Sequence, residues 1–512
     1  LATRLISRIR STLGVELAIR TLFEAPTIAG LVSRLKLAGP TRRTPLRPLP
    51  RPERLPLSYA QQRLWFLDRF EGPSPIYNIP LALRLTGMVD VDALKSALAD
   101  VVNRHESLRT IFPDAGDTPE QLILPPEAAR PSLEIFDLNE TDLSAALSAA
   151  ASYTFDLARE MPIRACMFRV DAASHVLLIL CHHIASDGWS MAPLARDLSQ
   201  AYQARIRGET GGLAMPPIQY ADYALWQRSL LGEEGQPGSL MACQGTYWLN
   251  RLAALPELLE LPADRPRPAV MSHRGGALPI ALSAELHRAL AAMAGRHQAS
   301  LFMVMQAGLA ALLTRLGAGT DIPLGSPIAG RTDDALDELV GLFVNTLVLR
   351  TDTSGDPDFG TLLERVRADD LEAYAHQDLP FERLVELINP SRSTAHHPLF
   401  QVMLTFQNNV RRSFEFPGLT VSPQPISTTT AKFDLSFTLW ERREADGSPI
   451  GILGRIEYAS DLFDAVSVEQ LSTRYVRLLE AVTTDVNRPI GQIELLSDRE
   501  RHQILEEWNA TA

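Results

Sequence analysis

From Leu57 onward the chain alternates between segments with helical and with strand-like spacing of apolar residues. Residues 89–105 (VDVDALKSALADVVNRH) place apolar residues three and four positions apart, which predicts an amphipathic helix with a charged face. Residues 175–182 (HVLLILCH) form a short apolar run between polar residues, which predicts a buried strand. Residues 339–352 (LVGLFVNTLVLRTD) and 399–409 (LFQVMLTFQNN) are also predicted to be strands.

Two further segments predict long helices. Residues 189–208 place one apolar stripe along a helix, made of Met191, Leu194, Ala195, Leu198 and Tyr202. Residues 301–317 (LFMVMQAGLAALLTRLG) are apolar almost all round, which predicts a buried helix. Such a mixture of helices and strands indicates an α/β or α+β body of about 440 residues, and a body of that size exceeds a single core, so we expect two lobes.

The first 56 residues follow a different pattern. Residues 1–14 have helical spacing and end at Gly14, and residues 19–39 predict a turn at Pro26, a Thr27 cap and a helix that closes near Gly39. A stretch rich in Pro and Arg follows, which favours an extended, semi-rigid linker. Residues 1–56 carry 11 Arg and Lys against 3 Asp and Glu, and we interpret this excess as a solvated linker without a charged partner.

Composition narrows the function classes. The net charge of −12 argues against a nucleic-acid surface, and no apolar stretch approaches the ~20 residues that span a bilayer. The N-terminal stretch lacks the compact apolar core of a signal peptide, and the three cysteines have no disulfide or zinc spacing. We therefore expect a cytoplasmic protein without a metal. Basic residues are nearly all Arg, with Lys only at positions 36, 95 and 432, which we interpret as codon usage.

The strongest chemical signal is the histidine pair in CHHIASDGWS, residues 181–190. If the strand continues through it, His182 and His183 point to opposite faces, so they cannot easily chelate one ion. One histidine then faces the packed interior, and the other is free to face a cavity. A histidine can accept and return a proton near neutral pH, and Asp187 could orient an imidazole or pair with a distant Arg. The pattern alone fits both a catalytic histidine and a buried structural one.

Phosphate-binding G-x-x-x-x-G-K-[ST], dinucleotide-binding G-x-G-x-x-G and nucleophile-elbow G-x-S-x-G motifs are all missing from the sequence. ATP activation, dinucleotide chemistry and a serine nucleophile are therefore not expected.

Six segments in a fixed order carry a family resemblance, and a seventh (391–402) fits loosely. They are SYAQQRLWFL (58–67), RHESLRT (104–110), HHIASDGWS (182–190), YADYALW (220–226), VGLFVNTLVLR (340–350) and HQDLPFERLV (376–385). From about Leu57 to Glu494 the sequence resembles condensation domains of nonribosomal peptide synthetases. The opening motif and the histidine motif resemble the class that joins an L-configured donor to an L-configured acceptor.

The resemblance implies a chloramphenicol-acetyltransferase-like α/β fold, with two pseudo-symmetric lobes in a V around a central tunnel. The N-lobe would span residues 57–228 and the C-lobe residues 229–495. Residues 1–37 resemble the helical C-terminal part of a peptidyl carrier domain, and residues 38–56 would be the Pro/Arg-rich linker. Residues 496–512 resemble the start of a linker toward an adenylation domain.

The implied reaction is amide formation between two carrier-bound thioesters. Upstream and downstream carrier domains would present the substrates on phosphopantetheine arms, and an adenylation domain would follow in the parent synthetase. The serine that carries the arm is expected just before Leu1, so this chain shows no attachment site. The condensation domain itself would bind no cofactor or metal tightly and would be monomeric.

The resemblance also assigns roles to individual residues. His183 would be the functional histidine, as a general base or as a hydrogen-bonding positioner of the amine, and the sequence does not separate the two. His182 would be structural, Asp187 would pair with Arg331, and Gly188 would leave space beside the reacting carbonyl. Asn345 is a candidate for the tunnel wall, Arg63 and Arg109 are expected to form scaffold ion pairs, and His396 and His397 are expected to be structural.

Two alternatives share this fold. An epimerisation domain keeps the histidine motif but removes an α-proton, and the segments RHESLRTIF and HQDLPFE argue against it. A catalytically inactive recruitment platform typically loses the histidine motif, which is intact here. A heterocyclising relative would replace the motif with an aspartate motif, and an acyltransferase with a free acceptor would lack the flanking segments.

Overall fold

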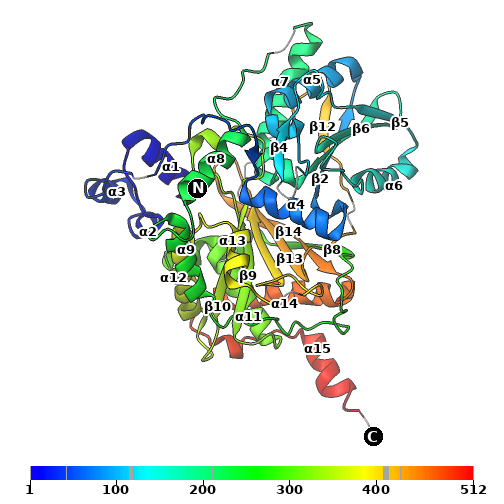
Figure 1. Ribbon diagram of the computed structural model, residues 1–512. Helices are drawn as coiled ribbons and strands as arrows, with labels where there is room; N and C mark the ends of the chain where they lie inside the picture. Colours follow the sequence, from blue (N-terminus) through cyan, green and yellow to red (C-terminus); the bar gives the residue numbers. More distant parts are fainter. Residues whose placement is uncertain are drawn as a thin grey trace.

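The computed structural model describes residues 2–41, 43–114, 119–209, 212–391, 393–407, 414–426 and 429–510. Two α/β lobes lie one above the other, with three short helices beside them at the N-terminal end (Figure 1). We call the lobe that holds the histidine pair the N-lobe and the other the C-lobe. The predicted mixed α/β fold with two lobes is confirmed.

The N-lobe is built on a five-stranded sheet in the order β12-β2-β7-β6-β5. Its central strand β7 runs antiparallel to both β2 and β6. The strands are β2 (Asn78–Thr86), β5 (Leu133–Asp137), β6 (Ile163–Arg169), β7 (Ser174–His182) and β12 (Thr420–Pro423), and a small separate sheet holds β1 (Leu55–Pro56), β3 (Thr110–Ile111) and β4 (Glu120–Ile123). The helices of this region are α4 (Tyr59–Glu71), α5 (Val91–Arg104), α6 (Glu140–Ala151), α7 (Met191–Ile206) and α8 (Tyr220–Leu231).

Strand β7 is buried on both faces, which explains why its sequence is apolar without a break from Val176 to Cys181. Leu177, Ile179 and Cys181 belong to the core that α5 and α7 cover, whereas Val176 and Leu178 pack with Leu143 and Leu147 of α6. The side chains of a strand alternate between its faces, so one continuous apolar run fills both cores. The predicted strand at 175–182 and the helix stripe of residues 189–208 are therefore confirmed.

The C-lobe is built on a six-stranded mixed sheet in the order β10-β9-β11-β13-β14-β8. Its strands are β8 (Gly275–Leu282), β9 (Asp321–Ile328), β10 (Asn345–Asp352), β11 (Val402–Gln407), β13 (Leu435–Arg443) and β14 (Pro449–Ala459). Its helices are α9 (Leu240–Arg251), α10 (Ala284–Arg296), α11 (Leu301–Arg315), α12 (Phe359–Ala375), α13 (Phe381–Ile388) and α14 (Ala465–Thr484). Residues 303–313 of α11 are all buried, as the apolar pattern predicts.

Strand β12 corrects the predicted division into lobes at residue 228. It follows most of the C-lobe in sequence, yet it pairs antiparallel with β2 at the edge of the N-lobe sheet, and Figure 1 shows its late-sequence colour among the blue and cyan strands. Phe414 and Phe416 enter the N-lobe core along with it. This strand covers the open edge of β2, whose unpaired backbone groups would otherwise need another partner.

Two predicted strands are shorter than expected. Residues 339–352 form a strand only from Asn345, because the backbone N–H groups of Gly341, Phe343 and Val344 donate to side chains of the N-lobe and are not free for a ladder. In the segment 399–409 the strand covers Val402–Gln407, and residues 408 and 409 lie outside the described part of the chain.

The N-terminal helices are α1 (Ala2–Leu13), α2 (Ile19–Glu24) and α3 (Ile28–Leu35). Gly14 ends α1 with a positive φ of 66°, and the Thr27 side chain caps α3 by accepting a hydrogen bond from Gly30 N at 3.2 Å, as predicted. Helix α3 ends at Leu35, earlier than the expected closure near Gly39. At the other end of the chain, α15 (Asp498–His502) continues into a short π-helical turn.

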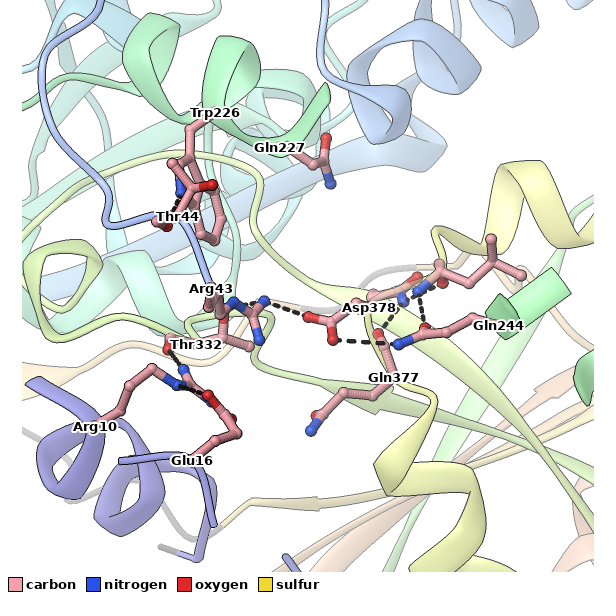
Figure 2. A network of polar contacts seen from close by, with 12 residues as sticks. Arg10, Glu16, Arg43, Thr44, Trp226, Gln227, Gln244, Thr332, Gln377 and Asp378 are labelled. Atoms are coloured by element: carbon pink, nitrogen blue, oxygen red, sulfur yellow. Dashed lines mark hydrogen bonds and ion pairs between the residues drawn. The ribbon is translucent and has the colours of Figure 1, made fainter. Parts of the chain in front are cut away.

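The linker after these helices binds both lobes, which corrects the expectation of a solvated linker. The Arg43 guanidinium pairs with Asp378 of the C-lobe and lies over the ring of Trp226 on α8, 5.5 Å from its centroid. The Trp226 Nε1–H donates to Thr44 O at 2.8 Å (Figure 2). Arg51 pairs with Asp222 at 3.2 Å and with Glu106 at 2.9 Å. Arg43 and Arg51 thus pair with carboxylates far from them in sequence, which the local pattern of charges did not indicate.

Two kinds of feature are absent from the described residues. No helix combines the length and the hydrophobicity that crossing a membrane requires. No group of three or more His, Cys, Asp and Glu side chains is placed to hold a metal ion.

A buried acid in α12 makes the stability of the C-lobe depend on pH. Asp370 is 1% exposed and accepts a hydrogen bond from Gln306 Nε2 at 3.1 Å. Burial raises the pKa of Asp370 to about 8, and the hydrogen bond from Gln306 only partly opposes this effect. The folded state therefore keeps its proton up to about pH 8, whereas the unfolded chain releases it near pH 4.

We predict that Asp370→Asn gains stability over the wild type as the pH rises. The raised pKa favours folding fully below pH 4, and this contribution is lost as the pH rises toward 8, whereas Asn has no charge to bury. Between pH 5 and pH 9 the variant should gain on the order of 4 kcal/mol relative to the wild type, because each of the three pH units up to the folded pKa contributes about 1.4 kcal/mol. Thermal unfolding of both proteins at several pH values measures this difference, and two parallel curves would contradict the prediction.

Candidate active site

The candidate site lies where β7 ends. The strand stops at His182, and His183–Ala185 form a 3₁₀ turn, so the strict alternation of faces does not extend to His183. The turn is stabilised by His182 itself, whose Nδ1 accepts a hydrogen bond from Ile184 N at 3.2 Å. The backbone change at this point turns His183 away from the position that an extended strand would give it.

The two histidines occupy different environments. His182 is 3% exposed and packs against the rings of Phe155 at 5.9 Å and Tyr77 at 6.4 Å. It lies on the face of β7 that includes Leu180, as the alternation predicts. His183 is partly exposed, although the residues on both sides of it in sequence are buried. Of the two imidazoles, that of His183 is therefore the one that a substrate can reach.

Both histidines are neutral at pH 7. Burial lowers the pKa of His182 to about 3, and the neighbouring His183 and Lys432 lower it further. Burial also lowers the pKa of His183 to about 4, Lys432 acts in the same direction, and Asp187 opposes the shift. A neutral imidazole can accept a hydrogen bond at one ring nitrogen and donate one at the other.

Asp187 connects the N-lobe to the C-lobe. Its Oδ1 accepts hydrogen bonds from the N–H and the hydroxyl of Ser190, both at 2.8 Å. Its Oδ2 accepts from Phe343 N at 2.9 Å and from Val344 N at 3.2 Å. The carboxylate is 1% exposed, so these donors replace the water that it loses on folding.

Arg331 completes this buried network. It lies 3.4 Å from Asp187 Oδ1, and its Nη2 donates to Ser190 Oγ at 2.9 Å. Its Nη1 donates to the carbonyls of Leu336 and Leu339, and its guanidinium lies over the Phe343 ring, 4.2 Å from the centroid. The structure thus brings Asp187 and Arg331 together as a buried pair.

Gly188 lies beside open space, and Asn345 binds the backbone of a neighbouring loop. Gly188 has no positive φ, and a Cβ built on it meets no atom within 4 Å, so the backbone does not require glycine there and the space beside it is open. Asn345 uses its amide on the backbone: it donates to Gln377 O at 3.0 Å and to Leu379 O at 2.8 Å, and it accepts from Phe381 N at 2.9 Å. Asn345 holds the loop before α13, on the wall of a pocket that Arg43 and Asp378 also line.

The remaining predicted residues make scaffold contacts. Arg63 of α4 reaches α13, where it lies 3.7 Å from Glu382 and 4.9 Å from the Phe381 ring centroid, and its Nη2 is 3.1 Å from His397 Nε2. Arg109 donates to Leu124 O and lies 3.6 Å from Glu106.

Sequence reasoning missed Lys432, a C-lobe residue whose charge acts on both histidines. The one signal for Lys432 in the sequence is the rarity of lysine in this Arg-rich chain, which codon usage explains equally well.

We predict that Asp187→Asn destabilises the protein strongly. The carboxylate of Asp187 accepts hydrogen bonds from backbone N–H groups, and the NH₂ group of an asparagine side chain cannot accept them. The substitution also removes the buried counter-charge of Arg331. The free energy of unfolding should therefore fall by about 3 kcal/mol. Chemical denaturation measures this change. The control is Asp92→Asn on α5, whose side chain is 95% exposed and should change stability by no more than about 0.5 kcal/mol. An unchanged denaturation midpoint for Asp187→Asn would show that the network is not a structural tie.

Comparisons with known proteins agree on one family. The sequence model of the Condensation domain matches residues 52–505, and that of the Phosphopantetheine attachment site matches residues 1–35. The Dimodular nonribosomal peptide synthase of Bacillus subtilis (strain 168) is 52% identical over 512 residues, which is 100% of this chain and 22% of that protein. The Probable non-canonical nonribosomal peptide synthetase (NRPS) CymA of Salinispora arenicola (strain CNS-205) is 52% identical over 505 residues, 99% of this chain and 6% of that protein. The chain thus spans less than a quarter of the length of these relatives.

Solved structures agree with the sequence comparisons. The X-domain from teicoplanin biosynthesis is 39% identical, with a TM-score of 0.83 over 88% of this chain and 100% of that one. The first condensation domain of the CDA synthetase, at 20% identity and a TM-score of 0.71 over 87% of this chain and 99% of that one, shares the fold. The chain belongs to the condensation-domain family of nonribosomal peptide synthetases, and a segment of the phosphopantetheine-attachment family precedes this domain.

Proposed function

We propose that this chain forms peptide bonds between two carrier-bound thioesters. The α-amine of a downstream aminoacyl thioester attacks the carbonyl of an upstream thioester, a C–N bond forms, and the C–S bond breaks. The thiol of the upstream arm leaves with the proton that the amine releases. The observation that carries this proposal is His183, a neutral and partly exposed imidazole at the end of a rigid buried strand.

His183 acts as a hydrogen-bond acceptor that positions the amine. With a pKa of about 4 its imidazole is a weak base, so it does not take the proton fully from the attacking nitrogen. It can still accept an N–H hydrogen bond and direct the nitrogen lone pair at the carbonyl, which lowers the entropic part of the barrier. His182 supports it by fixing the 3₁₀ turn, and Asp187 and Arg331 fix the next turn.

The proposal includes the partners of the reaction. Upstream and downstream carrier domains deliver the substrates on phosphopantetheine arms, and no cofactor stays bound to the condensation domain. An adenylation domain follows in the parent synthetase, the domain acts as a monomer in the cytoplasm, and donor and acceptor residues are both L-configured. The open space beside Gly188, next to the histidine turn, leaves room for the reacting carbonyl.

One observation favours a second candidate, a platform for another protein. The X-domain from teicoplanin biosynthesis is 39% identical to this chain, and a solved complex pairs that X-domain with OxyB. A platform of this kind would bind another protein through the surface of the fold and would not require a reactive His183. Epimerisation remains the third candidate, because it also needs an exposed histidine on the same fold.

We predict that His183→Ala lowers amide formation by at least about 100-fold while the thermal unfolding midpoint changes little, since the imidazole is partly exposed. The test mixes the protein with a dipeptidyl donor on one intact carrier and an L-aminoacyl acceptor on a second, and mass spectrometry of the acceptor arm measures elongation. His396→Ala is the matched control, because His396 belongs to the other histidine pair and should keep activity within about threefold.

Each other outcome of this assay opposes the proposal. Exchange of the donor's α-hydrogen for deuterium without elongation would identify epimerisation. If His183→Ala elongates the acceptor as fast as the wild type, His183 has no role in the reaction. A wild-type protein that changes neither substrate, over a panel of donors and acceptors, would favour the platform.

A further inference from the structure

The segment before β13 places one lysine between the two lobes. Lys432 is partly exposed, and its Nζ lies 4.9 Å from the centroid of the Tyr77 ring in the 3₁₀ turn that precedes β2. Among the described residues, no carboxylate lies within ion-pair distance of Lys432 and no acceptor takes a hydrogen bond from it. A lysine whose charge is neither paired nor directed fully into water is costly, so its retention in this place calls for a reason.

The residues around Lys432 hold it in place. Ala431 N donates to His273 O at 2.9 Å, and Phe433 packs against the ring of His397 at 4.9 Å and that of Phe400 at 5.3 Å. The next residue, Asp434, is fully buried, and both of its carboxylate oxygens bind Arg267. With the backbone fixed on both sides, the ammonium group is directed at the Tyr77 ring instead of sampling solvent.

Tyr77 contacts both Lys432 and the first histidine of the pair. Its ring lies 6.4 Å from that of His182, on the same face of the sheet as Phe155. The Tyr77 ring thus contacts both the C-lobe cation and His182, the residue directly before His183. Asp187, which opposes the lowered pKa of His183, already accepts hydrogen bonds from Ser190, Phe343 and Val344 and is paired with Arg331. Among the described residues, no carboxylate forms an ion pair with Lys432, and Glu457 only partly offsets its charge.

We propose that Lys432 is a positioning residue that adds to burial in favouring the neutral form of the His183 imidazole, and that favours the neutral form of the amine that binds to it. A cation close to both groups raises the free energy of imidazolium and of ammonium and leaves neutral imidazole and amine unaffected. The amine part of this inference rests on the proposed function, and the histidine part does not. The nucleophile in amide formation is the neutral α-amine. The charge of Lys432 therefore favours the reactive form of the acceptor amine at neutral pH.

The charged groups around Lys432 determine the pH range of this effect. They are Arg63 on α4, Glu457 on β14, the Tyr77 hydroxyl, His182 and His183. Burial lowers the pKa of Lys432 to about 8, with Glu457 opposing and Arg63 adding to the shift. Lys432 is thus still mostly charged at pH 7, and its effect on the amine fades as the pH rises through 8, where less help is needed to remove the proton.

The test measures the titration of His183 directly. The protein has 11 histidines, and NMR of a sample with isotope-labelled histidine follows each ring, with His183→Gln identifying the signal of interest. In Lys432→Met the pH midpoint of His183 should rise by about one unit, because a like charge nearby has been removed. Lys432→Arg should leave the midpoint near the wild-type value. The control Lys95→Met, on the exposed face of α5, should change nothing.

A second measurement tests the amine part. In the elongation assay, Lys432→Met should need a higher pH for half-maximal rate, by about one unit, and Lys432→Arg should restore the wild-type profile. An unchanged His183 midpoint in a Lys432→Met protein that unfolds at the wild-type temperature overturns the histidine part, whether or not the wild type makes peptide bonds. A shifted midpoint with an unshifted rate profile overturns the amine part alone. A wild type without elongation would oppose the proposed function and remove the basis of the amine part, while the NMR result still decides the histidine part.

Discussion

The buried carboxylate of Asp187 is the interaction on which the rest of the site depends. It lies between the N-lobe turn that follows the histidines and the C-lobe segment that leads into β10, and donors from both sides bind it. A buried charge of this kind is stable only when all of its donors are present together, so it fixes the position of one lobe against the other. The same bonds use the backbone N–H groups of Phe343 and Val344, which is why β10 begins only at Asn345.

Other contacts reinforce the lobe arrangement from different directions. Arg63 on α4 forms an ion pair with Glu382 on α13. Strand β12, late in the sequence, joins the N-lobe sheet, and the linker binds both lobes through Arg43 and Arg51. Each of these ties joins residues far apart in sequence. The histidine turn thus lies in a framework that is fixed on several sides, which a residue that positions a nucleophile requires.

The electrostatics of the site follow from this framework. The turn buries His182 fully and leaves His183 partly exposed, and both imidazoles are neutral because burial penalises their charged forms. Asp187 would favour a charged His183, but its hydrogen bonds and Arg331 already satisfy it. The charge of Lys432 acts in the opposite direction, so the site has a neutral hydrogen-bonding group close to an unpaired cation.

The sequence by itself determined those features that depend on local spacing. Strand β7, the stripe of α7 and the fully buried α11 follow from periodicity, because burial of one or two faces imposes a repeat that neighbouring residues carry. The order of the motifs identified the family and directed attention to His183, Asp187 and Arg331. Only the tertiary structure decided which histidine is accessible, where β10 begins and that residues 420–423 join the N-lobe sheet. It also decided that the linker is bound to both lobes and that Lys432 lies against the Tyr77 ring. Each of these depends on contacts between residues distant in sequence, or on a turn whose geometry those contacts set, and no local pattern records them.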